Sequence, residues 1–403
     1  MLDLSDILEA RKRVQETAKR TPLEHSYTYS AMTGAEVYLK LENFQRTGAF
    51  KIRGATNRIA TLSPDQKEAG VVTASAGNHA QGVALAATRS GVDAKIVMPE
   101  YAPIAKVKAT ESYGAEVVLA GADYAEAAER AHEIEREEGR TYVHAFDDEM
   151  VMAGQGTIGL EIIEDCPEVD TVVVPIGGGG LISGIATAIK AQSPETRVIG
   201  VQAEGASSAA KSLEKGKRVS LDGVDTIADG IATRSIGERT FEHIQEHVDE
   251  VVTVSDPEIA VTIVYLLERS KTLVEGAGAV ALAAVLFEAF EYDDGETIVP
   301  ALCGGNIDLN TLTTVVVRGL VETGRYLKIR TVLKDRPGSL EELLEIFTDH
   351  RANIYAIYHD RTSREVEMSD TEVEIELEMR GPDHVDAFLE ALREAGYEVD
   401  VLV

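Results

Sequence analysis

One lysine of this sequence stands in a setting that could support covalent chemistry. Lys51 lies in the stretch "LENFQRTGAFKIRGA", directly after Phe50 and a turn of small residues. A lysine amine that is withdrawn from water has a lowered pKa, and its neutral form can condense with a carbonyl group. An isolated lysine is far more often a solvated surface charge. The hypothesis that Lys51 is a reactive amine therefore depends on what the rest of the chain can place beside it.

A first glycine-rich loop, "SAGNHAQG", begins at Ser75 and separates a predicted strand from a predicted helix. Consecutive backbone amides at the start of a helix form a ready site for a carboxylate. The same residues are also explained without any ligand if Ser75 or Asn78 simply caps the helix. The loop alone leaves both interpretations open.

A second loop contains four adjacent glycines, Gly177 to Gly180, between another predicted strand and a helix. Without side chains, the backbone amides of such a loop can close around a phosphate at the positive end of the helix. The loop lacks the Lys-Ser/Thr pair of a P-loop, and it does not match the dinucleotide-binding GxGxxG pattern. It therefore indicates a cofactor monophosphate rather than ATP or a dinucleotide.

A third loop, "ALCGGNIDL", again follows a predicted strand and contains Cys303. A thiol at the end of a buried strand is usually a packing residue. Opposite a heteroaromatic nitrogen, however, Cys303 would supply a neutral hydrogen-bond partner rather than a carboxylate.

The elements that would position these residues are short apolar runs, separated by longer segments with helical apolar spacing. Continuous apolar strands that alternate with helices are typical of parallel sheets covered on both faces, so we expect an α/β fold. The runs interpreted as buried strands span residues 70–75, 94–99, 115–121, 171–177, 197–204 and 296–304.

The pattern changes after Arg318. The following residues give strand, helix, strand, strand, helix and strand, and the alternating stretch "EVEIELEM" predicts an antiparallel sheet with one polar face. We therefore expect a boundary near residues 318–327, followed by a compact βαββαβ domain.

The composition of the chain excludes some classes of binding partner. The chain has 403 residues, and its 69 Asp and Glu against 39 Lys and Arg give a formal net charge of −30. Such an acidic surface would repel nucleic acids and anionic membranes, so we expect neither as a partner. A solubilising surface and adaptation to a salty cytoplasm would each explain the charge, and the sequence does not separate them.

The cysteines and the apolar segments bear on the compartment. Cys166 and Cys303 are far apart and lack metal-type spacing, which fits a reducing environment. The first 20 residues read as an amphipathic helix rather than a signal peptide. Residues 276–290 are the most apolar segment, but they are too short to span a bilayer and predict a buried helix. We expect a cytoplasmic protein.

Several motifs, taken together, resemble those of the threonine/serine dehydratases, also called threonine ammonia-lyases. They are "LENFQRTGAFKIRGA", "SAGNHAQG", "GQGTIGLEI", "GGGGL", "TIADGIA" and "CGGN", and the resemblance covers about residues 5–318. Those enzymes are fold-type II enzymes, which have a tryptophan-synthase-β-like two-domain fold and use pyridoxal 5′-phosphate. The tail "LKDRPGSLEELLEIF" resembles an ACT domain, a small ferredoxin-like module that senses amino acids.

The resemblance implies a domain organisation. The catalytic region would span residues 1–318, with a large domain of about 1–50 and 148–318 and a small mobile domain of about 51–147. An ACT regulatory domain would span residues 326–403.

The resemblance also implies a role for each matching residue. Lys51 would form a Schiff base with the aldehyde of the cofactor, and its displaced amine would then remove the α-proton of the substrate. Asn78 would hydrogen-bond the 3′-oxygen of the cofactor ring. The full set of implied cofactor contacts is Phe50, Lys51, Asn78, Gly177, Gly178, Gly179, Gly180, Leu181, Gly230 and Cys303. The implied contacts to the substrate carboxylate are Ser75, Gly77, Asn78 and His79.

The implied activity is a β-elimination that converts L-threonine to 2-oxobutanoate and ammonia, and also L-serine to pyruvate. A serine racemase/dehydratase, a β-replacement enzyme and a non-catalytic amino-acid sensor remain alternatives. Ala76 argues against racemisation, because related racemases carry at this position a serine that can protonate the opposite face.

The sequence also bears on metal binding. Relatives that bind a divalent cation use a Glu followed six residues later by an Asp, whereas this chain has Glu204 and Ala210, so we predict no strong metal site.

The ACT-like tail predicts a homo-oligomer, a dimer or a tetramer. It also predicts regulation by a branched-chain amino acid, isoleucine or valine, bound near residues 335–340.

Overall fold

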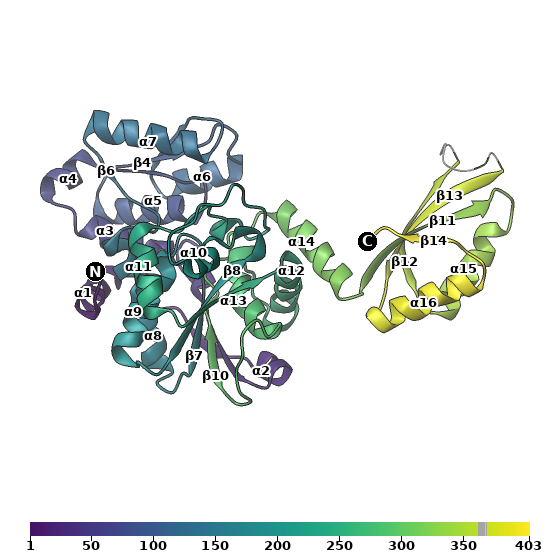
Figure 1. The fold of residues 1–403 in the computed structure, drawn as a ribbon. Helices are drawn as coiled ribbons and strands as arrows, with labels where there is room; N and C mark the ends of the chain where they lie inside the picture. The colour runs from purple at the N-terminus through teal and green to yellow at the C-terminus, as the bar shows by residue number, and fades with distance from the viewer. Residues whose placement is uncertain (362–366, 368) are drawn as a thin grey trace. The chain divides into compact units, whose positions relative to one another are not determined.

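The computed structural model describes residues 1–361, 367 and 369–403. They form two compact units, Met1–Asp308 and Leu309–Val403, which are drawn in Figure 1. Each unit has its own β-structure and its own hydrophobic core.

The first unit contains a six-stranded sheet with the strand order β1-β2-β10-β7-β8-β9. All its strands run parallel except β1, which pairs antiparallel with β2 at one edge. Strands β7 and β8 are nearly continuous apolar runs, as expected for a parallel sheet that is buried on both faces. The bounds are β1 (Leu23–His25), β2 (Glu36–Lys40), β7 (Thr171–Pro175), β8 (Arg197–Ala203), β9 (Glu250–Val254) and β10 (Thr297–Pro300).

A second parallel sheet of the same unit has the order β5-β4-β3-β6. Its strands are β3 (Val71–Ala74), β4 (Ala94–Met98), β5 (Glu116–Leu119) and β6 (Thr141–Tyr142). The six runs predicted as strands are confirmed and correspond to β3, β4, β5, β7, β8 and β10. The prediction missed β2 and β9, because polar residues within them interrupt the continuous apolar pattern. It also missed β1 and β6, which have only three and two residues.

Helices pack against these sheets and against one another. Helices α8 and α9 are in contact, α3 contacts both α5 and α8, and α13 contacts β7 and β8. The predicted amphipathic N-terminal helix is α1, and the predicted buried apolar helix is α13. Within the described residues, no helix combines the length and the apolar character needed to cross a bilayer.

The helices of the first unit have the following bounds: α1 (Leu4–Val14), α2 (Tyr27–Thr33), α3 (Lys51–Ala60), α4 (Pro64–Ala69), α5 (Asn78–Ser90), α6 (Ile104–Ser112), α7 (Tyr124–Glu138), α8 (Glu149–Asp165), α9 (Gly180–Gln192), α10 (Ser208–Glu214), α11 (Glu238–His247), α12 (Asp256–Tyr265) and α13 (Gly276–Leu286). Short 3-10 turns lie at η1 (Glu42–Phe44), η2 (Glu204–Ala206) and η3 (Asp229–Ile231), and a π-helical turn lies at η4 (Leu266–Ser270).

Glycines of the "GQGTIGLEI" motif let α8 approach its two neighbours closely. A Cβ atom on Gly154 would lie 2.6 Å from the Cα atom of Gly54 in α3. A Cβ atom on Gly156 would lie 2.8 Å from the carbonyl oxygen of Gly184 in α9. The motif therefore fixes a tight stack of α3, α8 and α9, and Lys51 stands at the start of this stack.

The second unit begins with α14 (Leu309–Glu322) and continues as the predicted βαββαβ unit, which is confirmed. Its antiparallel sheet has the order β12-β13-β11-β14. One face is apolar and buried, while the other carries charged residues such as those of the alternating strand β13. The remaining bounds are β11 (Tyr326–Lys334), α15 (Ser339–Asp349), β12 (Asn353–Asp360), β13 (Asp370–Glu378), α16 (Pro382–Glu394) and β14 (Val399–Val401).

Candidate active site

Two of the predicted loops leave the six-stranded sheet at the same edge. The tetraglycine loop follows β7 and the Cys303 loop follows β10, and these two strands are parallel neighbours. The carboxyl ends of parallel strands form the edge at which open α/β sheets bind ligands. The chain that leaves β2, which is also parallel to β10, runs from the same edge to Lys51.

The segment that precedes Lys51 is held by the Cys303 loop. The backbone amide of Phe50 donates to the carbonyl oxygen of Cys303 at 3.2 Å, and the amide of Gly305 donates to Gly48 at 2.8 Å. Gly48 has a φ of +69°, which residues with a side chain rarely adopt. Helix α3 begins at Lys51, so this pairing sets the place of its first side chain.

The amine of Lys51 is partly buried and donates to the backbone oxygen of Ala145 at 3.0 Å. Its Nζ atom lies 5.0 Å from the centre of the Phe50 ring. Burial lowers the pKa of Lys51 to about 8, although the nearby carboxylate of Glu275 favours the charged form. A substantial share of the amine is therefore neutral and nucleophilic near pH 8.

The tetraglycine loop offers unpaired backbone amides. Among the described residues, the N–H groups of Gly177, Gly178 and Gly179 donate to no protein acceptor. Those of Gly180 and Leu181 lie in the first turn of α9, where a helix has no internal acceptors. Adjacent donors at the positive end of a helix form an anion site.

Phe146 gives a separate reason why this loop is made of glycine. A Cβ atom on Gly178 would lie 2.3 Å from the Phe146 ring, and one on Gly180 would lie 2.8 Å from the Phe146 backbone. A Cβ atom on Gly177 would lie 3.0 Å from the Cα atom of Ile231. The close packing therefore requires glycine whether or not an anion is bound.

The loop at residues 75–79 leads into α5, and the amides of the first turn of this helix are available. Gly77 is the N-cap of α5, and no side chain of the described residues caps this helix. The hydroxyl oxygen of Ser75 accepts instead from the amide of Gly77 at 3.1 Å. The simple capping interpretation is therefore wrong for Ser75 and Asn78, and the amides of the first turn remain free for a ligand.

His79 is buried and electrically neutral. Its Nε2 atom lies 2.9 Å from the carbonyl oxygen of Val143, so Nε2 carries the hydrogen and Nδ1 does not. Among the described residues, this buried Nδ1 atom has no hydrogen-bond partner. Burial, with a smaller effect of Lys51, lowers the pKa of His79 to about 3. The imidazole therefore does not act as an acid at neutral pH.

Cys303 is buried, and its thiol donates to the carbonyl oxygen of Ala277 at 3.1 Å. Burial raises the pKa of the thiol far above its usual range, so the group stays neutral. This environment agrees with the prediction of a neutral hydrogen-bond partner, while the placement opposite a ring nitrogen stays a prediction.

Two residues without an assigned role lie beside Asn78. The Nδ2 atom of Asn78 donates to Oε1 of Glu275 at 2.6 Å, and the Nδ2 atom of Asn306 donates to Oδ1 of Asn78 at 2.8 Å. Burial raises the pKa of Glu275 to about 7, although the hydrogen bond from Asn78 opposes the shift. Asn306 is the last residue of the "CGGN" motif. Glu275 is a single acidic residue before an apolar helix, and no sequence pattern predicts a role for it. Gly230 lies close to Glu275, since a Cβ atom on Gly230 would be 3.2 Å from Oε1 of Glu275.

Residues 143–147, here called the connecting segment, join β6 to the start of α8 and contact His79, Lys51 and the tetraglycine loop. The carboxylate of Asp147 accepts from the amides of Glu238 and Arg239 at 3.1 and 2.9 Å, so it caps α11. The other contacts join Val143 to His79, Ala145 to Lys51, and Phe146 to the tetraglycine loop. The predicted residues thus surround one region, and their individual binding roles stay predictions.

Comparison with known proteins gives a consistent result. The sequence profile of the family described as "Pyridoxal-phosphate dependent enzyme" matches residues 14–304. An "L-threonine ammonia-lyase" of Thermotoga maritima is 48% identical over 402 residues, which cover 100% of both chains. The processed form of threonine deaminase isoform 2 from Solanum lycopersicum has a TM-score of 0.76 and 42% identity, covering 78% of this chain and 86% of that one. Maize serine racemase has a TM-score of 0.74 and 38% identity, covering 78% and 98%.

Proposed function

This chain belongs to the pyridoxal-phosphate dependent enzymes, and we propose that it is an L-threonine ammonia-lyase, which converts L-threonine to 2-oxobutanoate and ammonia. The observation that carries the proposal is a partly buried lysine amine, with a pKa of about 8, and a loop of unpaired backbone amides that contact adjacent residues of the connecting segment, Ala145 and Phe146. The full-length similarity to an L-threonine ammonia-lyase supports the choice of substrate.

The residues present fit the cofactor. The amides of Gly177 to Leu181 would hold its phosphate, and the neutral amine of Lys51 would react with its aldehyde. Phe50 and Cys303 would offer an aromatic face and a neutral thiol to the ring. When bound, the cofactor supplies the electron sink that makes the α-proton of an amino acid acidic.

The protein's own groups would then handle the substrate. The free amides of the first turn of α5, which begins at Asn78, would bind the substrate carboxylate. Lys51 would hold the proton removed from the α-carbon, because burial keeps its pKa near working pH. His79, which is neutral and hydrogen-bonded to Val143, would place the first turn of α5 without exchanging a proton.

Kinetics on purified protein test this proposal. We expect 2-oxobutanoate from L-threonine and a slower release of pyruvate from L-serine. We also expect Lys51→Ala to lose the visible absorbance band of the bound cofactor. Net formation of D-serine from L-serine would favour a racemase instead, and no turnover of any amino acid would refute the proposal.

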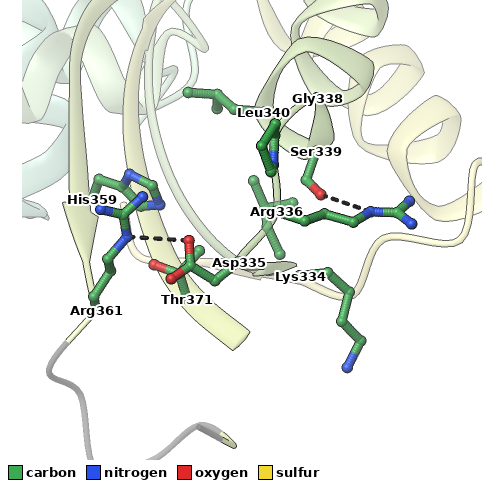
Figure 2. Close-up of a pocket in the computed structure, with 11 residues that line it drawn as sticks. Lys334, Asp335, Arg336, Gly338, Ser339, Leu340, His359, Arg361 and Thr371 are labelled. Carbon is green, nitrogen blue, oxygen red and sulfur yellow. Dashed lines mark hydrogen bonds and ion pairs between the residues drawn. The ribbon is translucent and has the colours of Figure 1, made fainter. Parts of the chain in front are cut away.

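We propose in addition that the second unit binds a branched-chain amino acid. A cavity of about 300 Å³ lies at the start of α15, and Figure 2 shows its lining side chains. Arg361 donates to Asp335 at 3.1 Å on one side, and Ser339 begins the helix on the other. Gly338, the N-cap, has a φ of +98°, and no side chain among the described residues caps the helix, so the first amides of α15 could hold a carboxylate.

A matched pair of variants tests this site in the full chain. Ser339→Asp puts a negative charge where the effector carboxylate would bind, yet an acid at a helix start stabilises the helix. Ser339→Asn is the uncharged control of the same size. We expect inhibition by isoleucine or valine to be lost in Ser339→Asp and kept in Ser339→Asn. Equal responses in the two variants would place the effector elsewhere.

Assembly and location remain part of the proposal. We propose a homo-oligomer, a dimer or a tetramer, in the cytoplasm, in keeping with the regulatory tail. Light scattering of the purified protein measures the assembly directly, and a monomeric mass would contradict it.

A further inference from the structure

We propose that Glu275 and Asn306 are positioning residues that set which end of the Asn78 amide, its nitrogen or its oxygen, meets the bound cofactor. The inference rests on the proposed function, because it takes Asn78 as a cofactor contact. Neither residue has to touch the substrate. They act through Asn78, the first residue of α5.

One backbone group at this site has a fixed polarity. The carbonyl oxygen of Thr47 can only accept, and it receives the Nδ2 atom of Asn306 at 2.6 Å. The nitrogen end of Asn306 must therefore face Thr47. The same Nδ2 atom donates its second hydrogen to Oδ1 of Asn78 at 2.8 Å.

This polarity passes on to Asn78. Since Oδ1 of Asn78 faces Asn306, its Nδ2 atom faces the other way and donates to Oε1 of Glu275 at 2.6 Å. A carboxyl oxygen is a strong acceptor and completes the chain without a conflict. One hydrogen on Nδ2 of Asn78 remains unused, and it is the group left for the cofactor.

Two glycines make room for this chain of hydrogen bonds. A Cβ atom on Gly48 would lie 2.4 Å from Oδ1 of Asn306. A Cβ atom on Gly304 would lie 2.4 Å from Oε1 of Glu275 and 3.2 Å from Nδ2 of Asn78. The nitrogen end of Asn78 thus lies on the side of Gly304, next to Cys303. The backbone is shaped so that these three side chains can meet.

The charges around Glu275 agree with an acceptor role. Lys106 and Lys51 favour its ionised form, while Asp229 and burial oppose it. Oε1 can accept from Asn78 in either state, because a protonated carboxyl group keeps one oxygen free of hydrogen. The orientation of Asn78 is therefore independent of the protonation of Glu275.

Isosteric variants separate positioning from a purely structural role. Asn306→Asp replaces the donor by an acceptor, so Asn78 must turn its nitrogen toward Asp and its oxygen toward Glu275. We expect the cofactor dissociation constant to rise by about tenfold or more, the effect of one lost hydrogen bond. We also expect a shift of the visible band of the bound cofactor. Asn306→Ala, which imposes no orientation, should raise the dissociation constant by only about threefold.

Variants of Glu275 form the second part of the experiment. Glu275→Gln keeps an acceptor oxygen and should stay within about threefold of wild type, whereas Glu275→Ala should weaken cofactor binding about tenfold. The double variant Asn306→Asp with Glu275→Gln restores a donor for the reversed amide. Its ligand-free melting temperature should recover relative to Asn306→Asp, while its cofactor affinity should not. Glu214→Gln, on the exposed side of α10, is the control substitution.

Two results would overturn the inference. Wild-type affinity and an unshifted band in Asn306→Asp would show that the orientation of Asn78 is irrelevant. A loss of affinity that simply follows the loss of melting temperature across all variants, the double variant included, would show a structural role only. Failure of the proposed function looks different, because wild-type protein would then bind the cofactor and release no 2-oxobutanoate from L-threonine.

Discussion

Lys51 and Arg53 lie two residues apart in helix α3, but their side chains have different electrostatic environments. Arg53 is 1% exposed and forms ion pairs at 2.7 Å with both Glu42 and Glu161. Lys40 completes this ion cluster through a 2.7 Å pair with Glu161. Lys51, in contrast, has a backbone oxygen as its hydrogen-bond acceptor.

The two environments shift pKa values in opposite directions. In the ion cluster, burial acts against the charges, but the opposite charges prevail, so the pKa of Arg53 is raised and that of Glu161 is lowered. In the candidate site burial prevails, which lowers the pKa of Lys51 to about 8 and raises that of Glu275 to about 7. Burial alone therefore does not create a reactive group, and the supply of counter-charges decides whether a buried side chain is locked or can titrate.

The largest effect is expected from Lys51→Ala. Loss of the amine should lower the rate of L-threonine elimination by about 10⁴-fold, because it removes both the covalent attachment and the base. The ligand-free variant should be at least as stable as wild type, since no buried amine remains to be desolvated. Steady-state kinetics and thermal unfolding of the ligand-free protein measure the two quantities. A large loss of stability would place Lys51 with the structural residues instead.

The next effect concerns the ion cluster. Arg53→Met should lower the free energy of unfolding by about 3–5 kcal/mol, because Glu42 and Glu161 lose a buried counter-charge. Arg20→Met is the control, since Arg20 pairs with Glu164 and Asp165 at a half-exposed surface, where a pair is worth about 1 kcal/mol or less. Denaturant unfolding compares them, and equal losses would contradict the distinction between the two environments.

A pH series tests whether Glu275 titrates abnormally in the folded protein. Its folded pKa of about 7 lies above the ordinary value of 4.5, so the folded protein holds an extra proton between these values. Its contribution to stability is therefore complete below pH 4.5 and is lost as the pH rises to 7. Ligand-free wild type should lose up to about 3 kcal/mol over this range relative to Glu275→Gln. Parallel curves for the two proteins would show that Glu275 ionises normally.

The smallest effect is expected at the helix crossing that both environments share. Gly154→Ala should cost about 1–3 kcal/mol, because the new methyl group would meet the backbone of Arg53 and Gly54 at 2.6 Å. Gly223→Ala is the control, since nothing lies within 4 Å of its added methyl group. Denaturant unfolding of both variants checks the difference, and an unchanged Gly154→Ala would mean that α3 and α8 can separate at no cost.

Much of the fold follows from local sequence patterns. The continuous apolar runs predict the parallel strands, since only strands buried on both faces tolerate such runs. The four adjacent glycines predict an anion site lined by backbone amides, whereas the role of Lys51 is implied by the resemblance of its motif to the threonine/serine dehydratases. The alternation in β13 likewise predicts the antiparallel sheet of the second unit.

The side-chain partners could not be predicted in the same way. Arg53 belongs to a motif identified in the sequence, but its partners Glu42 and Glu161 lie 11 and 108 residues away, so no local spacing reveals the cluster. Glu275 resembles an ordinary surface acid until the fold brings Asn78 to it across 197 residues. The pKa shifts depend on that packing and are invisible in composition or periodicity.

The connecting segment couples the movements of several parts of the candidate site. Its residues join the four-stranded sheet to α8, and within five positions they seat the Lys51 amine, back the tetraglycine loop and cap α11. A rotation of the four-stranded sheet would therefore move the oxygen of Ala145 and the ring of Phe146 together. The acceptor of the lysine amine and the ring that backs the tetraglycine loop are thus coupled through two adjacent residues of the backbone.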